Sequence, residues 1–264
     1  MFILYYLRDV LIWTGQLLWA ILGPFLLTAL LMQLFSNLLR SGFVKLFGLK
    51  AFIYLLAPGV MVHELGHALF CFPFRHRIVE MKMFSPQKDG TLGWVKKTYD
   101  PNSYWAQIGN FFIGTGPVWL GLTVLYLLTN WLLPVERFDG QGLSAFDAAY
   151  KFMDEVVLCD EAMGFQWFIW AYLTFAIGAN ITLSMPDIEG AWMGFCVIAF
   201  SVFAVCLVTG GYQAWPSLAA EAIKRFTGNV FYPMLTLFAI IGISSFTFWF
   251  IASLLTIKKK RRRR

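Results

Sequence analysis

The sequence predicts an all-α polytopic membrane protein with about six transmembrane helices and a small β-hairpin or loop element between the second and third. Apolar residues make up 59% of the 264-residue chain, and charged residues only 14%. A soluble domain carries about 25% charged residues, so this chain lacks the polar surface that a water-facing globule needs. Its longest apolar runs also reach the length of about 20 residues at which a helix crosses the hydrocarbon core.

Six apolar runs define the predicted spans. They lie near residues 10–39, 51–72, 105–133, 165–184, 190–210 and 232–257. The first run is too long for the apolar core of a signal peptide, so we interpret it as a retained span. Together the spans form a single integral-membrane domain over residues 1–264, in which no internal repeat is visible.

Two polar segments interrupt the apolar pattern. The first, 74–104, contains turn signals, and its stretch 90–95 has the composition of a strand. This segment favours a small hairpin, with an ordinary polar loop as the alternative. The second segment, 134–164, holds seven of the 15 acidic residues, and its part 144–158 has the pattern of a helix lying on the membrane surface.

The net charge of +6 points to the membrane rather than to nucleic acid. Fourteen of the 21 basic residues lie in the N-terminal segment, in 74–104 and in the C-terminal run 258–264. Because basic loops stay inside, this distribution predicts that both termini are cytoplasmic, in the plasma (inner) membrane if the source is bacterial. The terminal run is also suited to anionic lipids. No basic surface with interleaved aromatic residues accompanies it, so we expect no nucleic-acid partner.

One motif carries metal chemistry. His63 and His67 are four residues apart, so on a helix they project from one face, one turn from each other. Two imidazoles placed in this way bind one zinc ion, as in the H-E-x-x-H motif. Glu64 lies off that face, close enough to accept a proton from a water that the zinc activates. An accidental pair of histidines is less favoured here, because ionisable groups are costly inside a membrane.

A catalytic zinc needs a third protein ligand, for which two carboxylates are candidates. Asp187 and Glu189 lie at the inner end of the predicted fourth span, at the same membrane depth as the histidine motif. Pro186 interrupts the helix there, which allows a carboxylate to turn inward. The alternative is that these acids cap the following helix, where its dipole favours negative charge. We prefer Asp187 as the ligand, and Glu189 stays open.

These residues resemble the site-2 protease family of intramembrane zinc metalloproteases, of which this chain would be a divergent member. The resemblance covers the H-E-x-x-H motif with the Ala68-Leu69 that follows it, Gly116-Pro117 in the third span, and Pro186 to Gly190 after the fourth. The last patch is similar to the family's P-x-L-D-G, although strict register would put the family's aspartate at position 189. The family's asparagine after glycine-proline is replaced by Trp119-Leu120.

The resemblance implies a zinc metalloendopeptidase with one zinc ion per chain, held by His63, His67 and Asp187, with Glu64 as the catalytic base. The expected partner is a membrane protein whose transmembrane helix is cleaved. Expected substrate-binding residues are Gly90, Thr91, Leu92, Gly93, Asn110 and Asn180.

Two other functions remain as alternatives. One is a catalytically silent scaffold of the same fold, which the departures from the family pattern keep open. The other is a membrane transporter, which would place ionisable residues on several spans and carry repeats that are not visible here.

Overall fold

The structure is a computed structural model that describes residues 2–133, 147, 150, 164–209, 221, 242, 246–247 and 249–255. Nearly all of the predicted surface helix 144–158, most of the predicted sixth span and the basic run 258–264 lie outside these residues. The described part is mostly helical and contains one small sheet.

Within the described residues, three helices are long and apolar enough to cross a membrane. They contain the candidate spans Phe25–Phe47, Tyr104–Leu132 and Met185–Thr209, and a bent helix pair brings the number to four if the pair is one span. The membrane character of the chain is therefore supported, whereas six spans are not confirmed.

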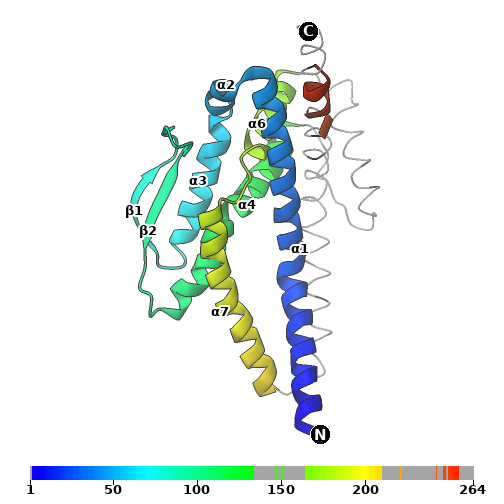
Figure 1. The fold of residues 1–264 in the computed structure, drawn as a ribbon, viewed down its shortest axis with the longest axis vertical. Coiled ribbons are helices and arrows are strands. Elements are labelled where there is room, and N and C mark those ends of the chain that lie inside the picture. Colours follow the sequence, from blue (N-terminus) through cyan, green and yellow to red (C-terminus); the bar gives the residue numbers. More distant parts are fainter. Residues whose placement is uncertain are drawn as a thin grey trace, which may run out of the picture.

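Helix α1 runs without interruption over Phe2–Phe47, which is longer than the predicted span 10–39. At 1.5 Å per residue its 46 residues extend about 70 Å, more than twice the thickness of a hydrocarbon core. Figure 1 shows α1 along the whole length of the molecule.

The predicted second span, 51–72, is broken into two helices. Helix α2 covers Leu49–Leu55, helix α3 covers Ala57–Cys71, and the two are bent by 60°. Pro58 lies in the first turn of α3, where its missing N–H costs no helical hydrogen bond. A single apolar run thus gives two helices.

The predicted hairpin is present. Strand β1 (Arg77–Lys82) pairs antiparallel with β2 (Trp94–Thr98), with a register irregularity between Ile78 and Glu80. The strands begin after the end of α3 and stand beside it, on the side away from α1 (Figure 1). The stretch 90–93, predicted as strand, belongs instead to the connection, where Gly90 adopts a positive φ of 94° that suits glycine.

Helix α4 covers Tyr104–Leu132 and agrees with the predicted third span. The predicted fourth and fifth spans have different boundaries, because α6 (Phe165–Gly178) ends early and α7 (Met185–Thr209) begins early. Pro186 therefore does not end the fourth span; it lies in the first turn of α7, where proline is tolerated.

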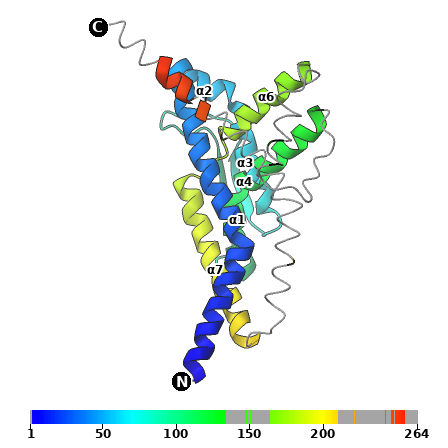
Figure 2. The same ribbon diagram turned by 90° about the vertical axis from the view of Figure 1, so that its right-hand side faces the viewer.

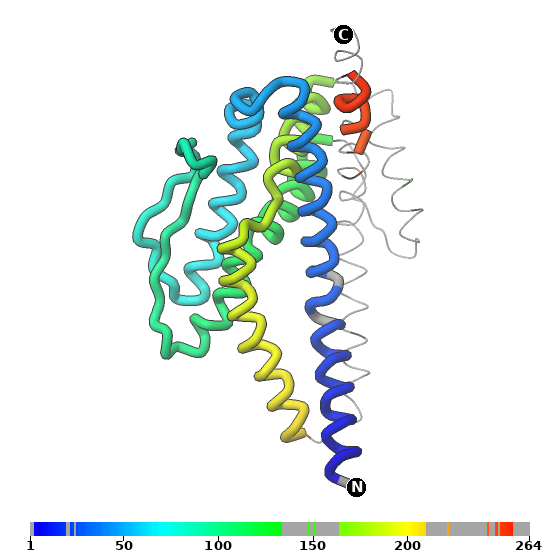
Figure 3. The backbone as a smooth tube through the Cα atoms, viewed as in Figure 1, coloured from blue at the N-terminus to red at the C-terminus, as the bar shows by residue number. Residues whose placement is uncertain are grey.

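At 14 residues, α6 is about 21 Å long and does not reach across a hydrocarbon core of about 30 Å. The extended connection between α6 and α7 lies against α1, as the turned view in Figure 2 and the tube in Figure 3 show. Helix α4 makes the main contacts of the bundle, with α3 on one side and α7 on another.

Candidate metal centre

Two helices cross α4 at close range next to the candidate site. At the first, a Cβ on Gly66 of α3 would lie 2.7 Å from the nitrogen of Pro117 and 2.8 Å from the carbonyl carbon of Gly116. Only a glycine permits this approach of one backbone to another, as at other tight helix contacts in membranes.

At the second crossing α4 meets α7. A Cβ on Gly114 would lie 2.5 Å from the carbonyl oxygen of Asp187 and 2.9 Å from the Cβ of Ala191. Gly114 and Gly116 are two residues apart and so face different sides of α4, which lets α3 and α7 approach from two directions. The two crossings bring the histidine motif and Asp187 together, although 120 residues separate them in the chain.

Three ligand atoms meet where the crossings converge. Nε2 of His63 and Nε2 of His67 are 3.3 Å apart, and Oδ1 of Asp187 is 3.2 Å from Nε2 of His67. Oδ2 of Asp187 lies 3.9 Å from Nε2 of His63. In a tetrahedral zinc site with bonds of about 2.0–2.1 Å, the ligand atoms are about 3.3 Å apart. The two separations from His67 Nε2 match this value, whereas the separation between His63 Nε2 and Asp187 is longer.

Both imidazoles are oriented by backbone carbonyls. Nδ1 of His67 lies 2.7 Å from the Ile113 oxygen in α4, and Nδ1 of His63 lies 3.0 Å from the Asn180 oxygen. Since a carbonyl oxygen only accepts, each Nδ1 carries a proton, and each neutral ring has its lone pair on Nε2. Second-shell bonds of this kind are typical of histidines that bind metals.

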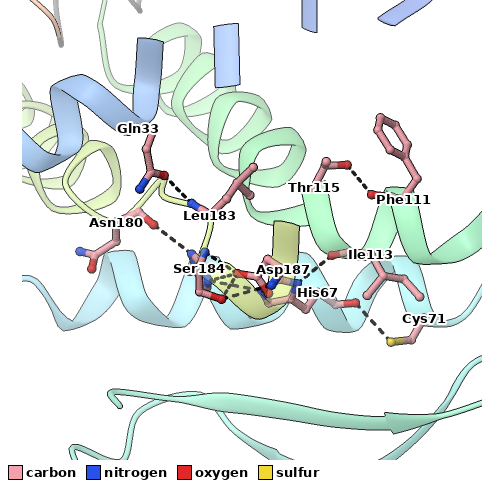
Figure 4. Close-up of polar contacts among 11 residues, drawn as sticks. Gln33, His67, Cys71, Phe111, Ile113, Thr115, Asn180, Leu183, Ser184 and Asp187 are labelled. Carbon is pink, nitrogen blue, oxygen red and sulfur yellow. Dashed lines mark hydrogen bonds and ion pairs between the residues drawn. The ribbon is translucent and has the colours of Figure 1, made fainter. Parts of the chain in front are cut away.

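The third ligand candidate also caps a helix. Oδ2 of Asp187 accepts from the backbone nitrogen of Ser184 at 2.8 Å and from its Oγ at 2.6 Å, while Ser184 Oγ accepts from the Asp187 nitrogen at 3.4 Å. This is a capping box at the start of α7. The two interpretations from the sequence are thus compatible, because Oδ1 faces His67 while Oδ2 serves the cap (Figure 4). Glu189 is exposed and does not join the group.

These residues fit a zinc ion. Two neutral imidazoles and one carboxylate offer three ligand atoms, the number of protein ligands in zinc sites that keep a fourth position open. In a place with little water, two lone pairs and an anionic oxygen at these separations would repel one another without a cation between them. Among the described residues, His63, His67 and Asp187 are the one such group.

Glu64 lies beside the ligands, at the wall of a cavity of about 640 Å³ that all four side chains line. Its side chain is 7% exposed, and the hairpin connection covers it: a Cβ on Gly93 would lie 2.7 Å from Glu64 Cγ. The candidate base, the ligand group and a space of the size that small-molecule sites occupy are therefore in one place.

The predicted substrate-binding residues all line this cavity: Gly90, Thr91, Leu92, Gly93, Asn110 and Asn180. Asn110 is 4% exposed, and its Nδ2 has no hydrogen-bond partner among the described residues. Its amide can therefore donate to a ligand. Asn180 differs, because its Nδ2 already donates to the carbonyl oxygens of Leu56 and Ala176, which joins α6 to the break between α2 and α3.

The sequence analysis missed Lys97, which also lines the cavity. Burial lowers the pKa of its ammonium group, and the nearby Asp187 carboxylate acts in the opposite direction. On β2, Lys96 and Thr98 are exposed while Lys97 between them is half-buried. A lysine at the inward position of an alternating strand is the signal that would have found it.

The remaining histidine has a structural position. Nε2 of His76 lies 2.9 Å from the Ala106 oxygen, and its ring stacks on Tyr99 at 4.5 Å between centroids. It lies outside the ligand group formed by His63, His67 and Asp187.

Comparisons with known proteins add no relative to this picture. No family model matches the chain, no curated protein is significantly similar to it, and no solved structure matches its fold.

Proposed function

We propose that this protein is a zinc-dependent intramembrane endopeptidase, a divergent relative of the site-2 proteases. One observation carries the proposal: two imidazole nitrogens and one carboxylate oxygen lie at the spacing of a tetrahedral zinc site, beside Glu64, inside a cavity next to apolar helices. A zinc ion held by His63, His67 and Asp187 would supply Lewis acidity to a water and to the scissile carbonyl.

Glu64 acts as the general base in this proposal. It accepts the proton of the attacking water and later passes it to the leaving amine. Its position in the turn of α3 between the two histidines keeps it beside the ligands without making it one, since the group that meets is His63, His67 and Asp187. The cover by Gly93 keeps its carboxylate out of bulk water.

The proposed substrate is a transmembrane helix that has unwound locally, because a helical peptide hides its carbonyls in its own hydrogen bonds. The stretch 90–95 lines the cavity along the edge of the hairpin, so an extended substrate segment can lie against it by strand addition. The unpartnered Asn110 amide lines the same cavity and supplies a donor for a substrate carbonyl.

Membrane orientation is a separate part of the proposal. The basic residues predict both termini in the cytoplasm, whereas Ser253 lies 3.5 Å from Lys45 Nζ, at the end of α1 far from the N-terminus. Single cysteines near residue 3 and at residue 253, labelled from one side of sealed vesicles, decide the matter. Labelling of both from the same side supports the prediction, and labelling from opposite sides overturns it without affecting the metal centre.

The direct test measures zinc content and cleavage together. The full chain is purified in detergent or nanodiscs, and wild type and Glu64→Gln are compared on a panel of single-span reporter proteins. We expect about one zinc per chain in both proteins, and cleavage that falls by about 10²–10⁴-fold in the variant because the base is lost.

Glu189→Gln is the matched control, since it removes an acid near the site that is exposed and outside the ligand group. It should keep both zinc and cleavage. Absence of zinc from the wild type would contradict the proposal, and bound zinc without cleavage of any reporter would favour the silent scaffold.

A further inference from the structure

The carbonyl that orients His67 belongs to a special place in α4. In an α-helix the carbonyl of residue i accepts from the N–H of residue i+4. The donor for Ile113 would be residue 117, which is proline and has no N–H. Pro117 lies inside the 29-residue helix α4, so the Ile113 carbonyl loses its helical donor in the middle of the element.

This carbonyl needs another partner. Ile113 is 1% exposed, and an unpaired carbonyl at such a depth costs about 1–3 kcal/mol where no water can replace the donor. Nδ1 of His67 takes the place of the missing N–H at 2.7 Å. The close crossing of Gly66 and Gly116 brings α3 near enough for this bond, as the view of Ile113 and His67 in Figure 4 shows.

We propose that Pro117 is a positioning residue of the metal centre. Because it lacks an N–H, it frees the Ile113 carbonyl to hold His67 with the proton on Nδ1 and the lone pair on Nε2, facing Nε2 of His63 and Oδ1 of Asp187. The proposal rests on the metal centre of the proposed function, but the tautomer of His67 can be measured without metal or substrate.

Both histidines are oriented by a carbonyl that has no i+4 helical donor. The Asn180 carbonyl that orients His63 lies beyond the end of α6 at Gly178, and it accepts from the Thr182 nitrogen at 2.9 Å as well. The Ile113 carbonyl lies within a continuous helix, so there a proline takes the role that the helix end takes for His63. An N–H at position 117 would compete with His67 for the same oxygen.

The test replaces Pro117 with alanine, which restores the N–H, in the full chain. Zinc affinity is measured by competition with a chelator, and stability by thermal unfolding of the metal-free protein. We expect zinc affinity to fall by about 10–100-fold, as for other second-shell changes. Unfolding should stay at the same temperature or move higher, because the helix regains a hydrogen bond.

Pro58→Ala is the matched control. Pro58 lies in the first turn of α3, where a new N–H has no helical acceptor to compete for, so zinc affinity should not change. Unchanged affinity in Pro117→Ala would overturn the inference, and so would an equal loss in Pro58→Ala.

A second measurement keeps the inference open to refutation if zinc is never bound. The ¹⁵N spectrum of histidine-labelled, metal-free protein reports which ring nitrogen carries the proton, and His67→Gln assigns the signal. We expect His67 protonated on Nδ1 in the wild type and a mixture of tautomers in Pro117→Ala. The same single tautomer in both proteins would overturn the inference, whereas wild-type protein that binds no zinc would contradict the proposed function alone.

Discussion

The two sides of the candidate metal centre are held in place by different kinds of contact. On the α3–α4 side, regular helices meet through backbone contact at Gly66 and Gly116, and helical geometry places His67. On the other side, the connection between α6 and α7 is extended, and side chains of α1 hold it. Gln33 Oε1 accepts from the Leu183 nitrogen at 2.7 Å, and Ser36 Oγ donates to the Ile181 oxygen at 3.1 Å.

Because of this difference, we expect substitutions on one side to affect mainly the stability of the fold and substitutions on the other to affect mainly the position of a ligand. A substitution at the α3–α4 crossing has no side chain that can move aside, so it strains two helices. A substitution along the connection removes individual polar contacts, so we expect it to disturb Asp187 more than the fold. Variants on the two sides should therefore differ in their effects on zinc affinity and on stability.

The largest expected effect is the loss of zinc affinity in Asp187→Asn. The change keeps an oxygen for the Ser184 cap but removes the charge of the third ligand. Zinc affinity should fall by more than about 100-fold, beyond the 10–100-fold that second-shell changes cause. Chelator competition measures it, with Glu189→Gln as the control, and equal losses in the two variants would show that Asp187 is not a ligand.

The next effect is expected for Gly66→Ala. The new Cβ would lie within 2.8 Å of the α4 backbone, so the helices must separate, at a cost of about 1–3 kcal/mol in the free energy of unfolding. Gly15→Ala is the matched control, because a Cβ there meets nothing within 4 Å. Denaturant titration in mixed micelles measures both, and a Gly66→Ala protein as stable as Gly15→Ala would refute the crossing.

A smaller effect is expected for Gln33→Leu on the connection. The Leu183 nitrogen loses its acceptor, and because Leu183 is part-buried we expect a cost of about 1 kcal/mol. Zinc affinity should fall by a larger factor than this stability loss implies, since Leu183 lies four residues from Asp187. A loss of stability with unchanged zinc affinity would contradict the expectation that contacts along the connection position Asp187.

The smallest effect concerns pH. Burial lowers the pKa of His76, so the unfolded chain binds a proton that the native protein does not hold between the lowered value and about 6.5. Stability contributed by neutral His76 is therefore present above about pH 6.5 and is lost as the pH falls below it, by at most about 1.4 kcal/mol per pH unit.

His76→Gln checks this effect, because it keeps a donor for the Ala106 oxygen but cannot titrate. The free energy of unfolding of the metal-free protein is measured at several pH values between 5 and 7. The variant should show a smaller change of this free energy with pH than the wild type. Equal slopes would show that other groups account for the dependence on pH.

The same comparison explains what the sequence could predict. His63, Glu64 and His67 share one helix, so their spacing alone places them on one turn. The hairpin, the third span and a carboxylate next to Pro186 as a partner of the histidines were also within reach. The choice between Asp187 and Glu189 was not, because it depends on a capping box that turns one carboxylate inward and leaves the other exposed.

Other features depend on contacts that no local pattern contains. The bend between α2 and α3 and the early end of α6 both fall inside apolar runs that hydropathy treats as uniform. Lys97 reaches the cavity only because its strand stands beside α3. The role of Pro117 needs the position of His67 on a different helix.

X-ray absorption at the zinc edge of the loaded full-length protein measures the proposed ligand set itself. We predict a four-coordinate zinc with two imidazole nitrogens and oxygen ligands at about 2.0–2.1 Å, and loss of the imidazole signal in the double variant His63→Gln, His67→Gln. A zinc ion with sulfur ligands, or an imidazole signal that survives the double variant, would contradict the assignment of the site.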